Sequence, residues 1–266
     1  MPARSAATYE PGTYETIHVR VQDSICFLQI DRPEARNAIN GRLIAECNEV
    51  LAACEEFATV VVLSGSPEVF CSGADFQAVA DGSADSDEQR GVPGPTYDLW
   101  MRMATGPYVT ISHVRGRVNA GGVGFVAASD VVLADETAQF SLSELLFGLF
   151  PACVLPFLVR RVGFQRAHYL TLTTSPISAR QASEWALVDA VEANSEALLR
   201  RHLVHLRRLS KTAIRRYKSY MSGVGLALHD LKPAALAANV ELFSDLDNRR
   251  AITRYVEQGL FPWEKR

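Results

Sequence analysis

Hydrophobic and polar residues alternate in the first part of the chain. The alternation runs through Tyr14–Val21 and Ile25–Ile30, with only the short segment Gln22–Ser24 between them. A period of two residues is typical of β-strands, because successive side chains point to opposite faces of a sheet. The pattern therefore predicts a β-hairpin.

The next segments switch between helical and strand patterns. Gly41–Glu56 carries apolar residues at spacings of three and four, and Thr59–Leu63 is a β-branched apolar run of the kind buried on both faces of a parallel sheet. Tyr108–Val114 and Asp130–Ala134 are strand-like again, and a short helix is predicted between them at Gly122–Ala128. This alternation predicts an α/β layered core.

The C-terminal quarter of the chain has a different pattern. After about Ala193 the strand-like runs stop, and four successive helices are predicted, at Ser195–Leu209, Lys211–Met221, Pro233–Phe243 and Asp247–Gln258. We therefore expect a core over residues 1–193 and a helical C-terminal subdomain over residues 194–266. Within the core, the polar segment Asp81–Pro95 is rich in Gly, Pro and Ser and is predicted to be a mobile surface loop.

Composition narrows the class of protein. The 266 residues, 48% hydrophobic and 21% charged, can bury one sizeable core and a smaller unit. A formal charge of −3 disfavours a protein whose main role is to bind nucleic acid. The N-terminus lacks a signal-peptide pattern, and the longest uncharged run, Leu145–Val159, is broken by proline and too short to span a bilayer. We expect no membrane segment.

Cysteine usage bears on the compartment and on metal binding. The five cysteines form no CxxC pair and leave one unpaired in any disulfide scheme. This spacing indicates neither a zinc cage nor a complete disulfide framework, so no metal is expected. Reduced thiols in a cytoplasmic protein fit best.

Two short segments place small residues between a predicted strand and a helix: Cys71–Phe76 and Asn119–Phe125. The first N–H groups of a helix have no intrahelical partner and lie at the positive end of its dipole, so each turn could bind an anion. A single turn of this kind is usually only a turn. Neither matches the glycine spacing of a dinucleotide site or a P-loop, so a nucleotide-phosphate loop is not expected.

Together with segments downstream, these turns resemble the crotonase (enoyl-CoA hydratase/isomerase) superfamily over nearly the whole chain. Five ordered segments carry the resemblance: Asp31–Asn40, Val69–Phe76, Arg115–Asp135, Ala138–Pro151 and Ser178–Asp189. The resemblance implies a spiral of ββα units followed by a helical trimerisation region, assembled as a homotrimer or hexamer.

The resemblance also implies an oxyanion hole made by the backbone N–H groups of Ala74 and Gly121, which would hold a thioester oxygen as it becomes an enolate. A thioester α-proton has a pKa of roughly 20 and a free Glu one of about 4.3, so direct transfer would cost on the order of 20 kcal/mol. One oxyanion donor contributes roughly 3–4 kcal/mol, and burial raises the pKa of a glutamate. Orientation must supply more.

The chain departs from typical hydratases of this superfamily at the first of their two glutamates, where it has Gly124. The second glutamate matches Glu144. Ser141-x-x-Glu144 is also a capping-box pattern, which on its own favours a structural role. The resemblance favours catalysis, with the pKa of Glu144 raised by its apolar neighbours Leu145, Leu146 and Phe147. One carboxylate still permits syn dehydration of a β-hydroxy thioester.

Within the superfamily, the sequence looks closest to the dehydratases of polyketide β-branching, of the bacillaene-pathway type. Three segments carry that likeness: Thr105–Gly122, Phe140–Leu158 and Arg254–Glu264. It implies dehydration of a 3-hydroxy-3-methylglutaryl group on an acyl carrier protein to the 3-methylglutaconyl thioester. No cofactor is expected beyond the phosphopantetheine that carries the substrate.

Four residues are candidates for binding the substrate. The backbone N–H of Ala152 matches a family position that helps to place water, and would steady the departing hydroxyl. Arg102, Lys218 and Asn119 are candidates for the distal carboxylate, although solvated charges and turn residues are the more common roles. His113 lies in a predicted strand and is expected to be a hydrogen-bonded core residue without a catalytic role.

Other interpretations stay open. A basic run in the C-terminal helices would dock an acidic carrier protein or simply form a solvated face: Arg200, Arg201, Arg207, Arg208, Lys211, Arg215, Arg216 and Lys218. Alternative activities are decarboxylation of the methylglutaconyl thioester and a CoA-dependent hydratase or isomerase. Outside catalysis, the chain could be an RNA-binding or assembly partner, although it lacks an interleaved aromatic platform. A serine hydrolase is not expected without GxSxG.

Overall fold

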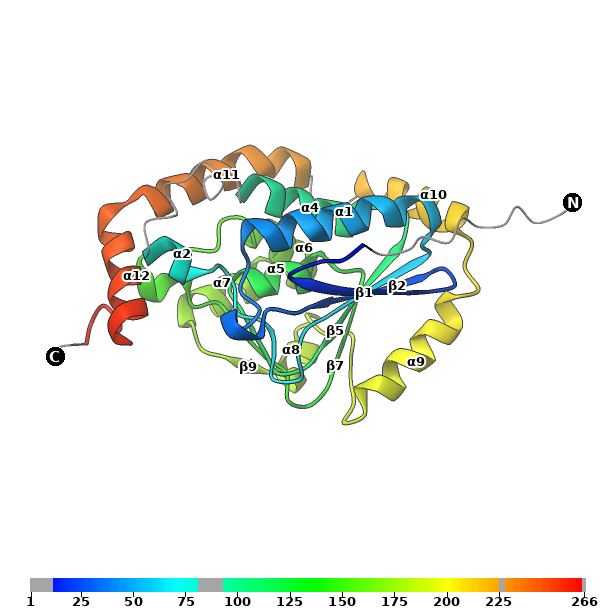
Figure 1. Ribbon diagram of the computed structural model, residues 1–266, viewed down its shortest axis with the longest axis horizontal. Coiled ribbons are helices and arrows are strands. Elements are labelled where there is room, and N and C mark those ends of the chain that lie inside the picture. Colours follow the sequence, from blue (N-terminus) through cyan, green and yellow to red (C-terminus); the bar gives the residue numbers. More distant parts are fainter. Residues whose placement is uncertain (1–11, 81–92, 225–227, 265–266) are drawn as a thin grey trace, which may run out of the picture.

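The computed structural model describes residues 12–80, 93–224 and 228–264, which form two β-sheets with helices around them (Figure 1). One sheet has the strand order β1-β2-β3-β5-β7-β10, and the other has the order β4-β6-β8-β9. The first sheet contains β1 (Ile17–Gln22), β2 (Ile25–Ile30), β3 (Val60–Ser64), β5 (Val109–Val114), β7 (Val131–Ala134) and β10 (Ala190–Val191). The second contains β4 (Val69–Cys71), β6 (Arg117–Asn119), β8 (Gln139–Ser141) and β9 (Ile177–Ser178).

From β3 to β8, successive strands alternate between the two sheets. β3 leads into β4, β5 into β6 and β7 into β8, and each pair is followed by a helix or a helical turn. Neighbouring strands are parallel, except that β1 and β9 pair antiparallel with β2 and β8. This arrangement confirms the predicted α/β class and the spiral of ββα units.

The helices follow in chain order. Up to the middle of the chain they are η1 (Pro33–Ala35), α1 (Gly41–Phe57), α2 (Phe76–Ala80), α4 (Pro93–Thr105), α5 (Gly121–Ala128) and η3 (Glu144–Phe147). The remainder are α6 (Leu155–Val162), α7 (Phe164–Thr173), α8 (Ala179–Glu184), α9 (Ser195–Leu206), α10 (Lys211–Ser222), α11 (Leu228–Ser244) and α12 (Leu246–Gln258).

Strand β3 is buried on both faces, as its apolar run predicted. Val61 and Leu63 belong to the main core, whereas Val60 and Val62 face a second, smaller core. Helix α9 covers that second core with three buried leucines: Leu198, Leu199 and Leu203. The alternation of faces follows from the two-residue period of a strand.

The N-terminal hairpin is also as predicted. β1 and β2 pair with Gln22 opposite Ile25, so that only Asp23 and Ser24 form the turn. Asp23 has a φ of 56°, in the left-handed region that Asp tolerates better than most residues.

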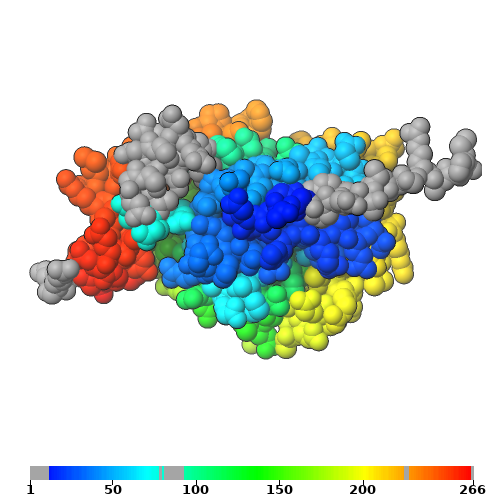
Figure 2. Space-filling view, in the orientation of Figure 1, coloured from blue at the N-terminus to red at the C-terminus, as the bar shows by residue number. Residues whose placement is uncertain are grey.

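Helices α2 and α12 pack against each other at one end of the molecule. Figure 1 shows α2 and α12 at the end where the described chain finishes, whereas α9 and α10 lie toward the opposite end. The space-filling view shows the same separation between the red C-terminal residues and the yellow residues of α9 (Figure 2). Helices α4 and α11 pack against each other, and α1 packs on α4.

Several predicted boundaries differ from the structure. Residues 81–92 of the predicted loop lie outside the described residues, but its last three residues, Pro93 to Pro95, begin helix α4. Proline is tolerated there because the first helical turn needs no intrahelical N–H donor. Helix α11 begins at Leu228 rather than Pro233, which lies inside it.

Helix α9 ends at Leu206 because a new helix starts shortly after it. Ser210 accepts a hydrogen bond from the Ala213 N–H and caps the start of α10. The division at residues 193 and 194 stays a prediction. All five cysteines are buried free thiols, and none of the helices in the described ranges is long and apolar enough to cross a membrane.

Candidate functional site

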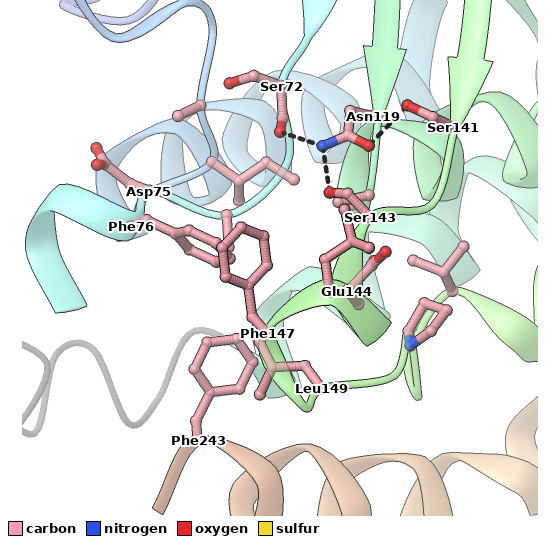
Figure 3. Close-up of a pocket in the computed structure, with 18 of the residues that line it drawn as sticks. Ser72, Asp75, Phe76, Asn119, Ser141, Ser143, Glu144, Phe147, Leu149 and Phe243 are labelled. Carbon is pink, nitrogen blue, oxygen red and sulfur yellow. Dashed lines mark hydrogen bonds between the residues drawn. The ribbon is translucent and has the colours of Figure 1, made fainter. Parts of the chain in front are cut away.

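A cavity of about 1410 Å³ opens at the end of the molecule where α2 and α12 lie. Both glycine-containing turns predicted to bind an anion line it, together with the short helix η3 and parts of α4, α11 and α12. The close-up in Figure 3 shows its polar upper part around Asn119 and its aromatic side at Phe147 and Phe243. The cavity is large enough for an extended ligand.

The two turns lie directly against each other. A β-carbon on Gly73 would lie 2.6 Å from the Cβ of Ala120 and 3.3 Å from the nitrogen of Gly121. Gly73 also has a φ of +93°, which favours glycine. The close approach therefore requires glycine at position 73, and it brings the N–H groups of Ala74 and Gly121 to one side of the cavity.

These two N–H groups are available to a ligand. Gly121 is the first residue of α5, so its N–H has no carbonyl one turn earlier to bond, and Ala74 is exposed at the cavity. Within the described ranges, neither N–H donates to a backbone carbonyl in the turns and loops. A β-carbon on Gly121 would lie 4.0 Å from the Ala74 nitrogen, so the two backbone nitrogens lie near each other at the cavity.

Ala120, within the second turn, carries backbone strain. Ala120 has φ 51° and ψ −123°, a conformation rare for a residue with a side chain. Such strain costs of order 1–3 kcal/mol and persists only where the surrounding structure enforces it. Here the Ala120 N–H donates to the Ser141 carbonyl at 3.0 Å, which holds the turn on strand β8.

Glu144 begins η3 and supplies a buried carboxylate to the same cavity. Its Oε2 is fully buried and, among the described residues, has no hydrogen-bond partner. Burial raises the pKa of Glu144 to about 7, although the backbone N–H groups of Glu144 and Ser143 partly oppose the rise. A carboxylate with a pKa near neutrality can both accept and return a proton at physiological pH.

The capping box suggested by Ser141 and Glu144 does not form. Ser141 ends strand β8 and its Oγ donates to Asn119 Oδ1 at 2.8 Å. The residue that precedes η3 is Ser143, whose side chain makes no cap hydrogen bond. The structural role that the local pattern favoured for Glu144 is therefore wrong.

Two other carboxylates line the cavity, and both differ from Glu144. Asp75 Oδ2 lies 3.1 Å from Nη2 of Arg32, and the two side chains are largely buried together. Glu34 is exposed on η1, with its carboxylate 3.8 Å from Arg32. Glu144 thus combines a buried carboxylate oxygen with the lack of a cationic partner among the described side chains.

Asn119 connects the two parts of the site (Figure 3). Its Nδ2 donates to Ser143 Oγ at 2.8 Å and more weakly to the Ser72 carbonyl at 3.5 Å, while its Oδ1 accepts from Ser141. The amide was a candidate for the substrate's distal carboxylate. It lines the cavity but uses its polar atoms on the protein, so it positions neighbouring residues instead.

Gly124 lies one turn beyond Gly121 on α5 and faces the indole of Trp100 from α4. A β-carbon on Gly124 would lie 2.3 Å from Cζ2 of Trp100 and 2.7 Å from Cε2. These distances are shorter than any van der Waals contact, so no larger residue fits at position 124 while the indole is in place. The indole of Trp100 thus fills the space that a glutamate side chain at position 124 would need, which the sequence alone did not indicate.

Ala152 lines the cavity, but its N–H is already engaged. It donates to the carbonyl of Phe150 at 2.8 Å within the turn that follows η3. The prediction that this N–H steadies a substrate hydroxyl therefore requires the intraprotein bond to be given up.

Arg102 and Lys218 are not among the residues that line the cavity, which corrects their assignment to the distal carboxylate. Arg102 Nη1 pairs with Glu55 Oε1 on α1. Lys218, only 5% exposed, donates to Asp130 Oδ2 at 2.6 Å and to the carbonyls of Met103 and Tyr108. Each cation is paired with a carboxylate, Lys218 inside the fold and Arg102 at a partly exposed position.

His113 is a core residue. Its Nε2 lies 2.9 Å from Ser195 Oγ, and the Glu196 carboxylate is 4.0 Å from Nδ1. Burial lowers the pKa of His113. His113 and Ser195 are both buried and neither lines the cavity, so this hydrogen-bonded group has no access to a substrate there.

Exposed cations line the cavity at a place that sequence reasoning missed. Arg36 and Arg117 are exposed, and within the described part of the chain no ion pair or side-chain hydrogen bond engages them. They belong to one edge, because Asn37 Nδ2 donates to the carbonyl of Val69 and Val69 pairs with Arg117. The predicted basic run instead lies mainly on α9 and α10, toward the opposite end (Figure 1).

An aromatic cluster closes the side of the cavity below Glu144. Phe147 contacts Phe76, Tyr255 and Phe261, with ring centroids 5.2–5.8 Å apart. The C-terminal helix thereby packs on the turn that carries Glu144 and helps to exclude water from it. Among the described residues, no group of three or more His, Cys, Asp and Glu side chains could hold a metal ion.

Comparisons with known proteins show the family to which the chain belongs. The model of the family "Enoyl-CoA hydratase/isomerase" matches residues 20–266. The bacillaene synthase dehydratase PksH of Bacillus subtilis is 58% identical over 253 residues, which cover 95% of this chain and 98% of that protein. A probable enoyl-CoA hydratase of Rhodobacter capsulatus is 29% identical over 92% of this chain and 96% of its own.

Solved structures are similar over nearly the whole chain. The crystal structure of a putative polyketide biosynthesis enoyl-CoA hydratase (pksH) from Bacillus subtilis superposes with a TM-score of 0.91 at 58% identity, covering 94% of this chain and 100% of that one. That of an enoyl-CoA hydratase from Bacillus halodurans gives a TM-score of 0.81 at 20% identity, over 90% and 99% of the two chains. The second likeness concerns the fold alone.

Proposed function

The chain belongs to the enoyl-CoA hydratase/isomerase family, and from this premise we propose that it dehydrates a 3-hydroxy-3-methylglutaryl group on an acyl carrier protein. The product would be the 3-methylglutaconyl thioester, made during polyketide biosynthesis. The chain is a lyase of the hydratase and dehydratase type. Its 58% identity to a dehydratase of bacillaene synthesis supports the choice of pathway chemistry.

One observation carries the proposal: a buried carboxylate with no cationic partner among the described side chains shares a cavity with two backbone N–H groups that bond no carbonyl in the described turns and loops. Glu144 supplies the carboxylate, and Ala74 and Gly121 supply the donors. Position 124 cannot add a second glutamate beside Trp100. These features support a reaction in which one group moves both protons.

The proposed reaction begins with the thioester oxygen accepting hydrogen bonds from Ala74 and Gly121. The Glu144 carboxylate removes the α-proton, and the electrons of that C–H bond move onto the oxygen as an enolate. The enolate then collapses, the bond from the β-carbon to the hydroxyl oxygen breaks, and the protonated Glu144 returns its proton to the departing oxygen. Water leaves, and the carboxylate is regenerated.

Magnitudes decide which parts of the site matter most. Raising the pKa of Glu144 from 4.5 to about 7 reduces the cost of proton transfer by only about 3 kcal/mol out of roughly 20. Two preorganised donors contribute roughly 3–4 kcal/mol each, and orientation contributes roughly 7–11 kcal/mol. The two turns that carry Ala74 and Gly121, here called the oxyanion turns, and the positioning of the substrate therefore lower the barrier more than the basicity of the carboxylate does.

The carrier protein is proposed to dock beside Arg36 and Arg117 rather than on the basic run of the C-terminal helices. A phosphopantetheine arm entering the cavity carries a phosphate, and carrier proteins of this kind are acidic, so both would be attracted by free cations at the edge of the cavity. Arg207 and Arg208 follow α9, toward the other end of the molecule (Figure 1).

Self-association into trimers or hexamers is part of the same proposal. Three large apolar side chains of α7 are more than half exposed: Phe164 at 68%, Tyr169 at 53% and Leu172 at 59%. An apolar surface of this kind on one helix favours burial against another copy of the chain.

Product mass tests the proposal against its alternatives. The protein is incubated separately with the hydroxymethylglutaryl carrier protein, with the methylglutaconyl carrier protein and with a short enoyl-CoA. The intact mass of each product is then measured by mass spectrometry. We expect loss of one water from the first substrate. Loss of carbon dioxide from the second would instead indicate a decarboxylase, and activity on the enoyl-CoA alone would indicate a CoA-dependent hydratase.

A further inference from the structure

The wall of the cavity at Trp100 has two properties that the proposed mechanism leaves unexplained. The indole fills the space beside Gly124, and its Nε1–H has no hydrogen-bond partner among the residues that the structure describes. Trp100 is only 2% exposed and its Nε1 is buried, so water does not solvate this N–H, and a ligand oxygen would reach it only by displacing the atoms that cover it. Buried donors without a partner are rare in native proteins and call for an explanation.

The position of the indole is fixed by its neighbours. Phe125 and Phe157 contact it edge-on, with ring centroids 5.9 and 5.8 Å away and interplanar angles of 81° and 78°. Gly124 meets its six-membered ring, and Cε2, the carbon bonded to Nε1, would be 2.7 Å from a β-carbon there. The N–H is therefore held close to α5, one turn from the Gly121 donor.

The chemistry of the group limits what it can bind. An indole N–H is a donor only and does not titrate, so it needs an oxygen acceptor and cannot remove a proton. Trp100 lines the same cavity as Glu144 and the oxyanion turn. A β-hydroxyacyl thioester bound by its carbonyl oxygen at Gly121 carries further oxygens beyond that carbonyl, at the β-hydroxyl and at the terminal carboxylate.

We propose that Trp100 is a substrate-binding residue whose Nε1–H donates a hydrogen bond to an oxygen of the acyl group beyond the thioester carbonyl. Its ring at the same time occupies the space of a second carboxylate at position 124. This inference rests on the proposed function, and it assigns to a neutral donor the part of the acyl chain that neither Arg102 nor Lys218 reaches. The oxygen is the β-hydroxyl or a terminal carboxylate.

Binding of unreactive analogues tests the inference without requiring turnover. Three pantetheine amides, in which nitrogen replaces the thioester sulfur and the carbonyl oxygen is kept, are compared by calorimetry: one with a β-hydroxyl, one with a terminal carboxylate, and one with neither. Trp100→Phe should weaken the binding of one of the first two analogues about tenfold and leave the binding of the third unchanged. Only the analogue whose oxygen accepts from Nε1–H loses a hydrogen bond. Which of the two is weakened identifies the acceptor.

A second variant separates the hydrogen bond from packing. The smaller ring of Phe leaves a space beside α5, and Gly124→Ala combined with Trp100→Phe refills it with the methyl group that clashes in the wild type. The double variant should regain the thermal stability lost in Trp100→Phe but not the affinity for the oxygen-bearing analogue. Recovery of that affinity would mean that Trp100 acts only by packing, and would overturn the inference.

The remaining outcomes are also informative. Equal losses for all three analogues, or no loss for any, would overturn the role of the N–H while leaving the proposed dehydration intact. Absence of water loss in the mass assay, with the selective binding effect still present, would instead reject the proposed function and keep Trp100 as a binding residue.

Discussion

Asn119 Nδ2 lies 2.8 Å from the Oγ of Ser143, the residue directly before Glu144. Asn119 ends strand β6, and the oxyanion turn follows it immediately. Ser141 Oγ donates to Asn119 Oδ1 at 2.8 Å, which sets the orientation of the amide. The side chain of Asn119 thus connects the turn that carries a proposed oxyanion donor with the turn that carries the proposed base (Figure 3).

Replacing Asn119 should slow turnover without preventing binding. Asn119→Leu keeps the volume but loses the hydrogen bonds, so we expect kcat to fall about tenfold with little change in KM, because small displacements of a base are costly. Steady-state kinetics on carrier-bound substrate measures this. Wild-type kcat in Asn119→Leu would show that the connection does not position Glu144.

The rate of dehydration should depend on pH through Glu144. Its pKa is raised to about 7 by burial, and a general base must be ionised, so kcat/KM should fall about tenfold per pH unit below 7 and level off above it. Asn119→Asp should move this midpoint upward, because a carboxylate beside Ser143 disfavours ionisation of Glu144. A midpoint near 4.5 in the wild type would contradict the buried state of Glu144.

Gly73 should be intolerant of a side chain. Gly73→Ala combines a φ of +93° with a contact of 2.6 Å to Ala120, so it displaces the Ala74 donor and should lower kcat about 10²–10³-fold. Gly94→Ala on α4 is the matched control, because a β-carbon added at Gly94 would meet no other atom within 4 Å. Equal kinetics for the two variants would remove the Gly73 turn from the oxyanion hole.

Charge reversal should separate the two candidate docking surfaces. Arg36→Glu with Arg117→Glu should lower kcat/KM for carrier-bound substrate about tenfold at low salt and leave a short pantetheine substrate unaffected. Arg207→Glu with Arg208→Glu, toward the other end of the molecule, should change neither. A loss with the second pair alone would return the docking site to the C-terminal helices.

Local patterns predicted most of the fold because they record which face of an element is buried. The two-residue period predicted the hairpin, and the apolar run at β3 predicted a strand buried on both faces. The motifs pointed to Ala74, Gly121 and Glu144, which line one cavity, since those residues lie within short, ordered segments. Helix α4 escaped notice because its start looks like the end of a polar loop.

The remainder of the site depends on contacts between distant segments. A cation in a sequence does not reveal its partner: Lys218 pairs with Asp130, 88 positions away, and Arg102 with Glu55, 47 positions away. Likewise, Gly124 shows in the sequence that the first glutamate is absent. It does not show that the indole of Trp100 occupies the space where that side chain would lie. The hydrogen bond from the Ala152 N–H to the Phe150 carbonyl also cannot be inferred from the sequence.

The central claim is that Glu144 alone moves the protons of a dehydration. Its most direct test is intact mass measurement of hydroxymethylglutaryl carrier protein after incubation with the wild type and with Glu144→Gln, together with the affinity of both for an unreactive analogue. We predict loss of one water with the wild type, none with Glu144→Gln, and similar binding by both. Water loss at a near-wild-type rate with Glu144→Gln would contradict the claim.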